Sequence, residues 1–296
     1  MLPSFTKKLA TPLGESRLQV CFFVLQALVL CGLGLALYGK VLVALFLNWA
    51  SDVTYSHGYI VPVFTAYLIY RRRSWLRTIV PRSSWTGLPL ILFALAMLIV
   101  GELSAELFMV RISLLLLIAG AVIFFGGWEF FRAVLYPWLT LFLMIPLPGI
   151  IFHRLTFPLQ LFASESATWI LEIAHIPVLR NGNILELAQM RLEVAEACSG
   201  IRSLISIVTF AVIIGYYLEK RNSLRLCLVL SSIPVAVAAN SIRIILTGIL
   251  CSQFGPTLAT GFFHEFSGWV TFMAAVLCLL IVQWALHEIR AFFRTE

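Results

Sequence analysis

"ISLLLLIAGAVIFFG", residues 112–126, contains no charged side chain and no proline. A helix needs roughly 20 apolar residues to cross the hydrocarbon core of a bilayer, so we expect this stretch to extend into its flanks. The rest of the chain has the same character. Of its 296 residues, 61% are hydrophobic and 12% are charged, and the charged fraction is about half that of soluble globular domains. The sequence therefore predicts an all-α polytopic membrane protein.

Apolar segments of this kind recur along the whole chain. The first follows basic residues like a signal peptide, but no small-residue cleavage site follows it cleanly, so we read it as an uncleaved span. Only the residues "HEIRAFFRTE" follow the last apolar segment. We therefore expect residues 1–296 to form a single integral membrane domain without a C-terminal accessory domain. The eight expected transmembrane helices are about 18–38, 57–70, 86–101, 112–126, 133–147, 200–218, 225–250 and 266–286.

Basic residues indicate how these spans are oriented. Fourteen of the 21 Lys and Arg residues fall at one set of span ends, including the run Arg71–Arg73, and five fall at the opposite ends. Because Lys and Arg concentrate in cytoplasmic loops, we expect both termini in the cytoplasm. The net charge of +7 then reflects the orientation of the spans in the membrane. It does not indicate a nucleic-acid partner, and the expected partner is the lipid bilayer.

The segment 148–197 is expected to lie outside the cytoplasm. It is too long for a simple connector. Residues 155–176 mix apolar residues with serines and glutamates, which predicts an amphipathic helix in the outer interface. Residues 181–198 alternate apolar and polar side chains around Ala188-Gln189, which predicts a short β-hairpin, with Asn181-Gly182 as the turn before it.

The predicted hairpin leads to Cys198 at the outer mouth of the sixth span. Of six cysteines, only Cys198, in "EACSGIRSL", has polar neighbours, and the six show no metal-type spacing. Arg243 falls in the outer half of the seventh span, and His264 opens the eighth on the same side. A thiol, a guanidinium and an imidazole are therefore predicted to share one leaflet.

These three groups suit nucleophilic catalysis. A nearby cation increases the thiolate fraction, histidine can move the proton, and arginine can hold a developing oxyanion. The alternatives are a structural cysteine, an arginine that reaches the outer headgroups and an interfacial histidine. Supporting roles are predicted for Asn240, which shares a helix face with Arg243, for Arg202 and Glu265, and for His57 as a rival base.

Four motifs give the sequence a resemblance to a known family. They are "SHGYIVPVFTAYLIYRRR" at 56–73, "EACSGIRSL" at 196–204, "NSIRI" at 240–244 and "HEFSGW" at 264–269. In this order they resemble the exosortase/archaeosortase family of membrane cysteine transpeptidases. The resemblance implies that Cys198, Arg243 and His264 are catalytic and that the site faces the periplasm from a bacterial inner membrane. It also implies substrates with a C-terminal PEP-CTERM signal, which is a Pro-Glu-Pro motif, a transmembrane helix and a basic tail, and a link to exopolysaccharide production.

The implied mechanism is cleavage through a thioacyl-enzyme and transfer to an unknown acceptor. An intramembrane protease would use the same nucleophile with water as acceptor. A non-enzymatic component of exopolysaccharide assembly or export would use Arg243 to hold an acidic glycan or a lipid phosphate. A permease is a third reading, but no inverted repeat is visible. No ligand-spaced cluster or phosphate loop appears, so neither a metal nor an organic cofactor is expected.

Overall fold

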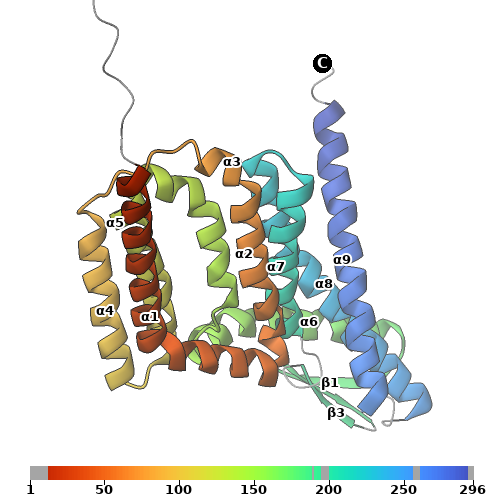
Figure 1. Ribbon diagram of the computed structural model, residues 1–296. Coiled ribbons are helices and arrows are strands. Elements are labelled where there is room, and N and C mark those ends of the chain that lie inside the picture. The colour runs from red at the N-terminus through yellow and green to blue at the C-terminus, as the bar shows by residue number, and fades with distance from the viewer. Residues whose placement is uncertain (1–12, 189, 195–199, 256–260, 293–296) are drawn as a thin grey trace, which may run out of the picture. The chain divides into compact units, whose positions relative to one another are not determined.

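The computed structural model describes residues 13–188, 190–194, 200–255 and 261–292 (Figure 1). The chain divides into two compact units, Met1–Leu47 and Asn48–Glu296. The described part of the first unit belongs to one long helix, α1 (Leu13–Ser51), which continues well past the expected span 18–38. The second unit contains every residue that the sequence nominates for a site.

The second unit is mostly helical, as expected. Each expected span from the second to the eighth falls on a helix, although the helical bounds differ from the expected ones by several residues in places. Two 3₁₀ segments, η1 (Val53–Tyr59) and η2 (Leu141–Met144), break the regular helices. The α-helices are α2 (Ile60–Arg71), α3 (Arg73–Leu76), α4 (Gly87–Leu103), α5 (Leu107–Thr140), α6 (Gly149–Ile173), α7 (Gly200–Leu218), α8 (Asn222–Phe254) and α9 (Gly261–Phe292).

The prediction of eight transmembrane helices is confirmed in part. Among the described residues, four helices are long and apolar enough to cross a membrane, which establishes a multi-span membrane protein, while eight spans are not confirmed. α4 and the apolar part of α7 (Leu204–Leu218) are apolar but shorter than that limit. The four candidate spans, selected by length and composition, are Gly32–Ser51, Leu107–Met144, Asn222–Phe254 and Phe266–Glu288, and the second of them contains a turn at Gly127.

α5 reverses direction at Gly127. This residue has φ 81° and ψ 176°, a left-handed φ that favours glycine, so the two halves of α5 are separate helices. They pack antiparallel, since Trp138 Nε1 of the second half donates a hydrogen bond of 2.9 Å to the carbonyl of Leu115 in the first. Figure 1 shows the same reversal. The expected spans 112–126 and 133–147 therefore lie on opposite sides of a turn, as expected for two consecutive spans.

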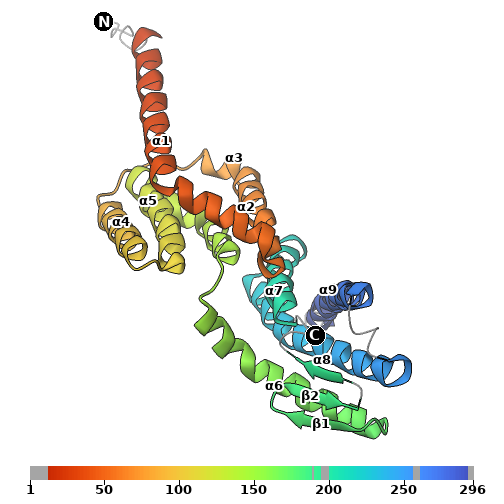
Figure 2. The same ribbon diagram turned by 90° about the horizontal axis from the view of Figure 1, so that it is seen from below.

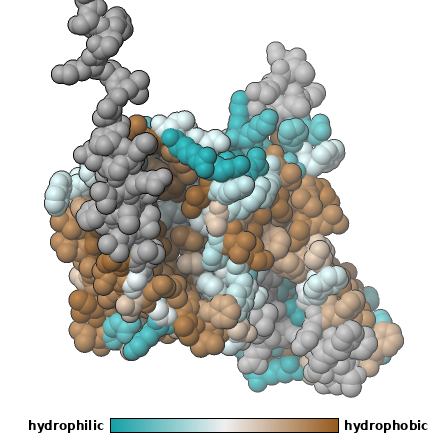
Figure 3. Space-filling model, viewed as in Figure 1, coloured by the Kyte–Doolittle hydropathy of each residue, from teal (hydrophilic) through white to brown (hydrophobic). Residues whose placement is uncertain are grey.

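The outward faces of the helices are apolar. Phe93 of α4 is 59% exposed, Leu246 of α8 is 50% exposed and Leu277 of α9 is 59% exposed. In Figure 3 hydrophobic residues cover most of the visible helix sides, and hydrophilic residues gather near the helix ends. Large apolar surfaces of this kind are stable against lipid and unstable in water.

A small three-stranded sheet lies against α6 and α8 (Figure 2). The strands β1 (Val178–Asn181), β2 (Ile184–Leu187) and β3 (Met190–Glu193) pair antiparallel in the order β1-β2-β3. The predicted hairpin is β2–β3, with Leu187 opposite Met190 across the expected turn, and this prediction is confirmed. β1 was not predicted, because it is largely exposed and its residues do not alternate in polarity.

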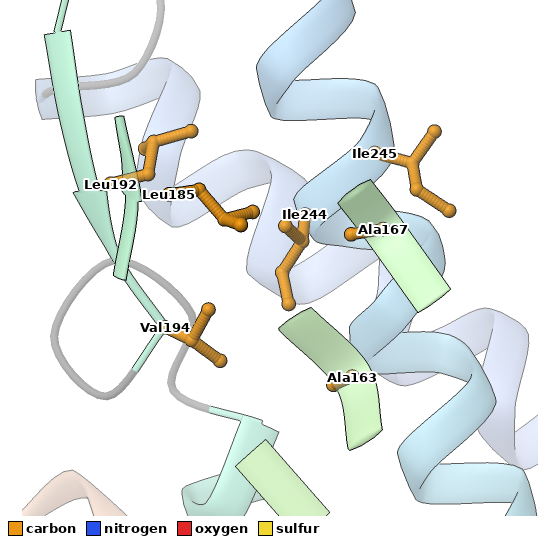
Figure 4. Close-up of a cluster of buried hydrophobic side chains, with 7 residues drawn as sticks. All are labelled: Ala163, Ala167, Leu185, Leu192, Val194, Ile244 and Ile245. Carbon is orange, nitrogen blue, oxygen red and sulfur yellow. The ribbon is translucent and has the colours of Figure 1, made fainter. Parts of the chain in front are cut away.

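The predicted amphipathic helix is α6, and it has one buried face. The buried residues recur every three or four positions, from Thr156 through Ala163 and Ala167 to Leu171. This face packs on α8 and the sheet, in a cluster of Ala163, Ala167, Leu185, Leu192, Val194, Ile244 and Ile245 (Figure 4). The cluster anchors the sheet beside the part of α8 that holds Arg243.

Candidate active site

Helices α7, α8 and α9 pack around one apolar cluster. Ile207 and Ala211 of α7 meet residues of α8 and α9 there, including Leu228 and Leu279, which are 0% exposed. Consecutive helices of such a bundle run antiparallel. The start of α7, the end of α8 and the start of α9 therefore lie at the same end of the bundle, which is the arrangement that the predicted site requires.

Arg243 is buried in α8, with 5% of its surface exposed. Its chain neighbours Ile244 and Ile245 pack against the sheet and α6, and its own carbonyl accepts a hydrogen bond of 2.8 Å from Thr247 Oγ1. A charged side chain within a membrane-spanning helix is costly to bury and usually marks a function. The burial excludes the alternative in which the Arg243 side chain lies in the outer headgroups.

The guanidinium of Arg243 lies directly against Gly268 of α9. A Cβ atom built on Gly268 would lie 3.2 Å from both Cζ and Nη2 of Arg243 and 3.3 Å from Nη1. Such distances are tighter than almost all Cβ contacts, so the missing side chain of Gly268 makes room for the guanidinium. His264 and Glu265 precede Gly268 by four and three residues in α9, which places them within one helical turn of this contact. Their side chains lie outside the described residues.

The start of α7 lies at the level of Arg243. A Cβ on Gly215 would lie 3.6 Å from both Arg225 Cα and Leu228 Cδ2, which aligns this part of α7 with the first turns of α8. Antiparallel α-helices advance equally per residue. Gly200 lies 15 residues before Gly215 in α7, and Asn240 and Arg243 lie 15 residues after Arg225 and Leu228 in α8. Gly200 is therefore level with the turn from Asn240 to Arg243.

Cys198 falls in residues 195–199, outside the described part of the chain, as does the side chain of Arg202. Both ends of this segment are described. Val194, on one side, is 1% exposed in the cluster beneath the sheet, and its N–H donates to the carbonyl of Asn183 at 2.9 Å. Gly200, on the other side, begins α7. The chain therefore enters the segment from the sheet beside α8 and leaves it at the level of Arg243.

Asn240 lies three residues before Arg243 and is half-buried. In the described part of the chain its Oδ1 atom is buried without a hydrogen-bond partner. A buried amide oxygen without a donor is costly. This oxygen, level with the start of α7, is therefore available to a donor in the proposed site.

His57 holds three elements together. It is 4% exposed in η1, and its Nε2 donates a hydrogen bond of 3.1 Å to the carbonyl of Leu143 in η2. Its Nδ1 lies 3.3 Å from Ser206 Oγ of α7. Burial lowers the pKa of His57 from its ordinary value of 6.5, against the smaller opposing effect of the carbonyls of Leu143 and Thr54.

Ser206 lies about 9 Å along the axis from the start of α7. Because His57 contacts Ser206, it lies about as far along the bundle from Gly200 and from the level of Arg243. The two ring nitrogens of His57 contact a carbonyl and a hydroxyl. The geometry of His57 is therefore that of a structural histidine.

One residue at the site was not singled out from the sequence. Gly268 lies within the quoted motif "HEFSGW", but its role depends on the approach of two helices, which the motif alone does not give. Elsewhere in the molecule, Arg111 is one of the five basic residues expected at the outer span ends, and α5 buries it to 6% exposure. In the residues covered by the structure, no three His, Cys, Asp or Glu side chains gather closely enough to hold a metal ion.

Comparisons with known proteins agree with this layout. The family model described as "Transmembrane exosortase" matches residues 49–281, which include η1, the sheet and the three helices of the candidate site. No curated protein and no solved structure matches the chain. The match covers most of the chain, and the protein is therefore a member of the transmembrane exosortase family.

Proposed function

We propose that this protein is a membrane cysteine transpeptidase that cleaves a C-terminal sorting signal. Membership in the exosortase family supports the reaction class. The observation that carries the assignment of residues is the approach of Arg243 to Gly268 of α9, level with the start of α7. Cys198 lies two residues before α7, and His264 lies one turn before Gly268. The start of α7, Arg243 and the start of α9 lie at one end of the bundle, and this supports the assignment.

In the proposed first step, the Cys198 thiolate attacks the scissile carbonyl carbon of the substrate. The carbonyl electrons move onto oxygen, and Arg243 stabilises this oxyanion because its buried guanidinium acts in a medium of low dielectric. Collapse of the tetrahedral intermediate breaks the C–N bond. His264, having taken the thiol proton, gives it to the leaving amine.

The second step transfers the acyl group to an acceptor. An acceptor amine attacks the thioester, the C–S bond breaks, and the proton of the amine returns to Cys198 through His264. With water as the acceptor the same steps give hydrolysis. Asn240 is proposed to offer its buried Oδ1 to a donor in the site, and Arg202 and Glu265 are proposed to adjust the charge around the thiol and the imidazole. His57 is proposed as a structural support of η1.

The proposed setting is a bacterial inner membrane with both termini in the cytoplasm and the site facing the periplasm. The distribution of Lys and Arg supports this orientation. The proposed substrates are PEP-CTERM proteins, whose C-terminal helix would lie among the spans and present its Pro-Glu-Pro motif at the height of Cys198. Such substrates would connect the enzyme to surface proteins exported together with exopolysaccharide.

The decisive experiment replaces the thiol and follows a substrate. The full chain is co-expressed with a protein that ends in Pro-Glu-Pro, an apolar helix and a basic tail, and the size of that protein is followed on a gel. Cys198→Ala and Cys198→Ser are expected to abolish processing. Cys251→Ala, which removes a buried thiol from the end of α8, is the control and is expected to process normally. Normal processing by Cys198→Ala would rule out the covalent mechanism and favour the non-enzymatic export component.

A further inference from the structure

A second polar site lies at the opposite end of the helices from the proposed active site. A cavity of about 430 Å³ opens between the end of α2, the second half of α5, the C-terminal half of α7 and the first turns of α8. Three arginines, Arg72, Arg132 and Arg225, line it, and no carboxylate does. We propose that this cavity, called here the arginine pocket, binds the phosphate group of an anionic phospholipid.

The charge of the arginine pocket is not neutralised by the protein. No carboxylate of the described residues forms an ion pair with any of the three guanidiniums. Glu129 precedes Arg132 by three residues in α5 and is exposed, with no ion pair to a pocket arginine. Glu219 lies between α7 and α8, and its Oε1 accepts a hydrogen bond of 2.9 Å from Gln283 of α9. Three cations around one cavity repel one another, and a bound anion removes this repulsion.

The pocket walls hold two of the guanidiniums in place. Arg225 donates to the carbonyls of Glu219 and Tyr216, at 2.9 Å and 3.4 Å, and lies 5.1 Å from the centre of the Tyr216 ring. Arg72 donates to the carbonyl of Ala133 at 2.7 Å. These contacts fix two cations without neutralising them. The site is therefore organised before any ligand arrives.

The start of α8 adds to the attraction for an anion. Asn222, the first residue of α8, lines the pocket, and the N-cap residue Arg221 makes no side-chain capping hydrogen bond. The first N–H groups of a long helix carry partial positive charge and bind phosphate oxygens. Guanidiniums and a helix N-terminus thus face the same cavity.

The remaining lining favours a lipid over a free anion. Leu135, Val212, Leu226 and Val229 supply an apolar wall next to the arginines. Leu226 is 58% exposed on the outer face of α8, so the apolar wall is continuous with the lipid-facing surface. A phospholipid matches both parts, because its head group is anionic and its acyl chain is apolar. Basic pockets between membrane helices commonly bind anionic lipids in this way.

The test uses the purified full chain in detergent. Native mass spectrometry measures the fraction of protein that carries phosphatidylglycerol as the lipid concentration rises, with phosphatidylcholine as the zwitterionic comparison. Arg132 is the residue to change, because its side chain is exposed and has no hydrogen-bond or ion-pair partner among the described residues. Arg77→Gln is the matched control, since Arg77 is exposed near the same end but does not line the pocket.

Arg132→Gln is expected to weaken phosphatidylglycerol binding about fivefold, the effect of one basic residue near a lipid surface, and Arg132→Glu is expected to weaken it further. Arg77→Gln and binding of phosphatidylcholine are expected to show no such change. Equal loss of phosphatidylglycerol binding in the Arg132 and Arg77 variants would contradict the proposal that the lipid binds in the arginine pocket. Displacement of the lipid by an equal concentration of inorganic phosphate would overturn its assignment as a lipid site.

Discussion

The guanidinium of Arg243 packs so closely against Gly268 that a side chain at position 268 would press on it. The two residues come from different helices, α8 and α9, and a Cβ on Gly268 would approach Arg243 Cζ to 3.2 Å. The proposed oxyanion-stabilising group is therefore positioned by the absence of a side chain on the helix that contains His264. This relationship leads to the first prediction.

Gly268→Ala is expected to reduce processing about tenfold. The added methyl group would lie 3.2 Å from Arg243 Cζ, so the guanidinium has to move by a few tenths of an ångström. Misplacement of a catalytic group by about 1 Å costs about 10²-fold in rate, and this smaller shift is expected to cost about tenfold. Overpacking of this size destabilises a protein by only about 1–3 kcal/mol, so the variant is expected to remain folded. Substrate processing and thermal unfolding in detergent provide the two readouts. Gly39→Ala is the control, because a Cβ at Gly39 meets nothing within 4 Å. Unchanged processing in Gly268→Ala would show that the contact is incidental.

Arg243→Lys is expected to lose processing by about 10²- to 10³-fold, as for the loss of one oxyanion donor. Lysine keeps the charge but lacks the planar set of donors. Arg111→Lys is the matched control, since Arg111 is 6% exposed and Arg243 is 5% exposed. Both variants are expected to lose similar stability, while processing per folded molecule falls only in the Arg243 variant. Equal losses of processing would mean that burial, and not position, explains the effect.

His57 is expected to make stability depend on pH. Burial lowers its pKa below 6.5 in the folded protein, so the unfolded chain binds the proton more tightly. Stability is then full above pH 6.5 and decreases as the pH falls from there through the folded pKa, by at most about 1.4 kcal/mol per pH unit.

His57→Gln is expected to flatten the decrease in melting temperature between pH 7 and pH 5, measured by thermal unfolding in detergent. It is also expected to leave the pH profile of processing unchanged, because His264 is the proposed base. Ser206→Ala provides the comparison, because it removes the partner at Nδ1 and keeps the titrating ring. A changed pH profile of processing in His57→Gln would assign the proton transfer to His57.

The sheet is expected to support the site through packing. Leu185→Ala removes a side chain that is 0% exposed in the cluster with Ile244. The substitution is expected to lower the free energy of unfolding by about 2–5 kcal/mol. It is also expected to reduce processing, because the cluster packs against the part of α8 that holds Arg243. Leu179→Ala, on the neighbouring strand at 66% exposure, is expected to change stability by no more than about 0.5 kcal/mol. The difference between the two melting temperatures tests the role of the cluster.

Much of this architecture was predictable from periodicity. The predicted sixth span coincides with α7, and the turn at Ala188-Gln189 gave the register of Leu187 with Met190. Both predictions rest on local signals, namely a continuous apolar run and a strict alternation. β1 has no such signal. It is a strand because β2 offers a free edge, which is a property of the folded chain.

The candidate site was predictable only in outline. Counting spans and charges placed Cys198, Arg243 and His264 at the same end, and the structure brings the start of α7, Arg243 and the start of α9 together. The contact of Arg243 with Gly268 and the link from His57 to Ser206 could not be predicted. Each depends on how closely two helices approach, and this distance follows from packing across the whole bundle.

The reversal at Gly127 has a consequence for the sidedness of the enzyme. A Cβ there would collide with the carbonyl of Arg82, so position 127 accepts no other residue without rearrangement. An uninterrupted α5 would direct the segments after it toward the opposite side of the membrane, and the proposed site would then face away from the proposed substrate. The side of the membrane that the proposed site faces thus depends on the backbone conformation of Gly127, a residue outside that site.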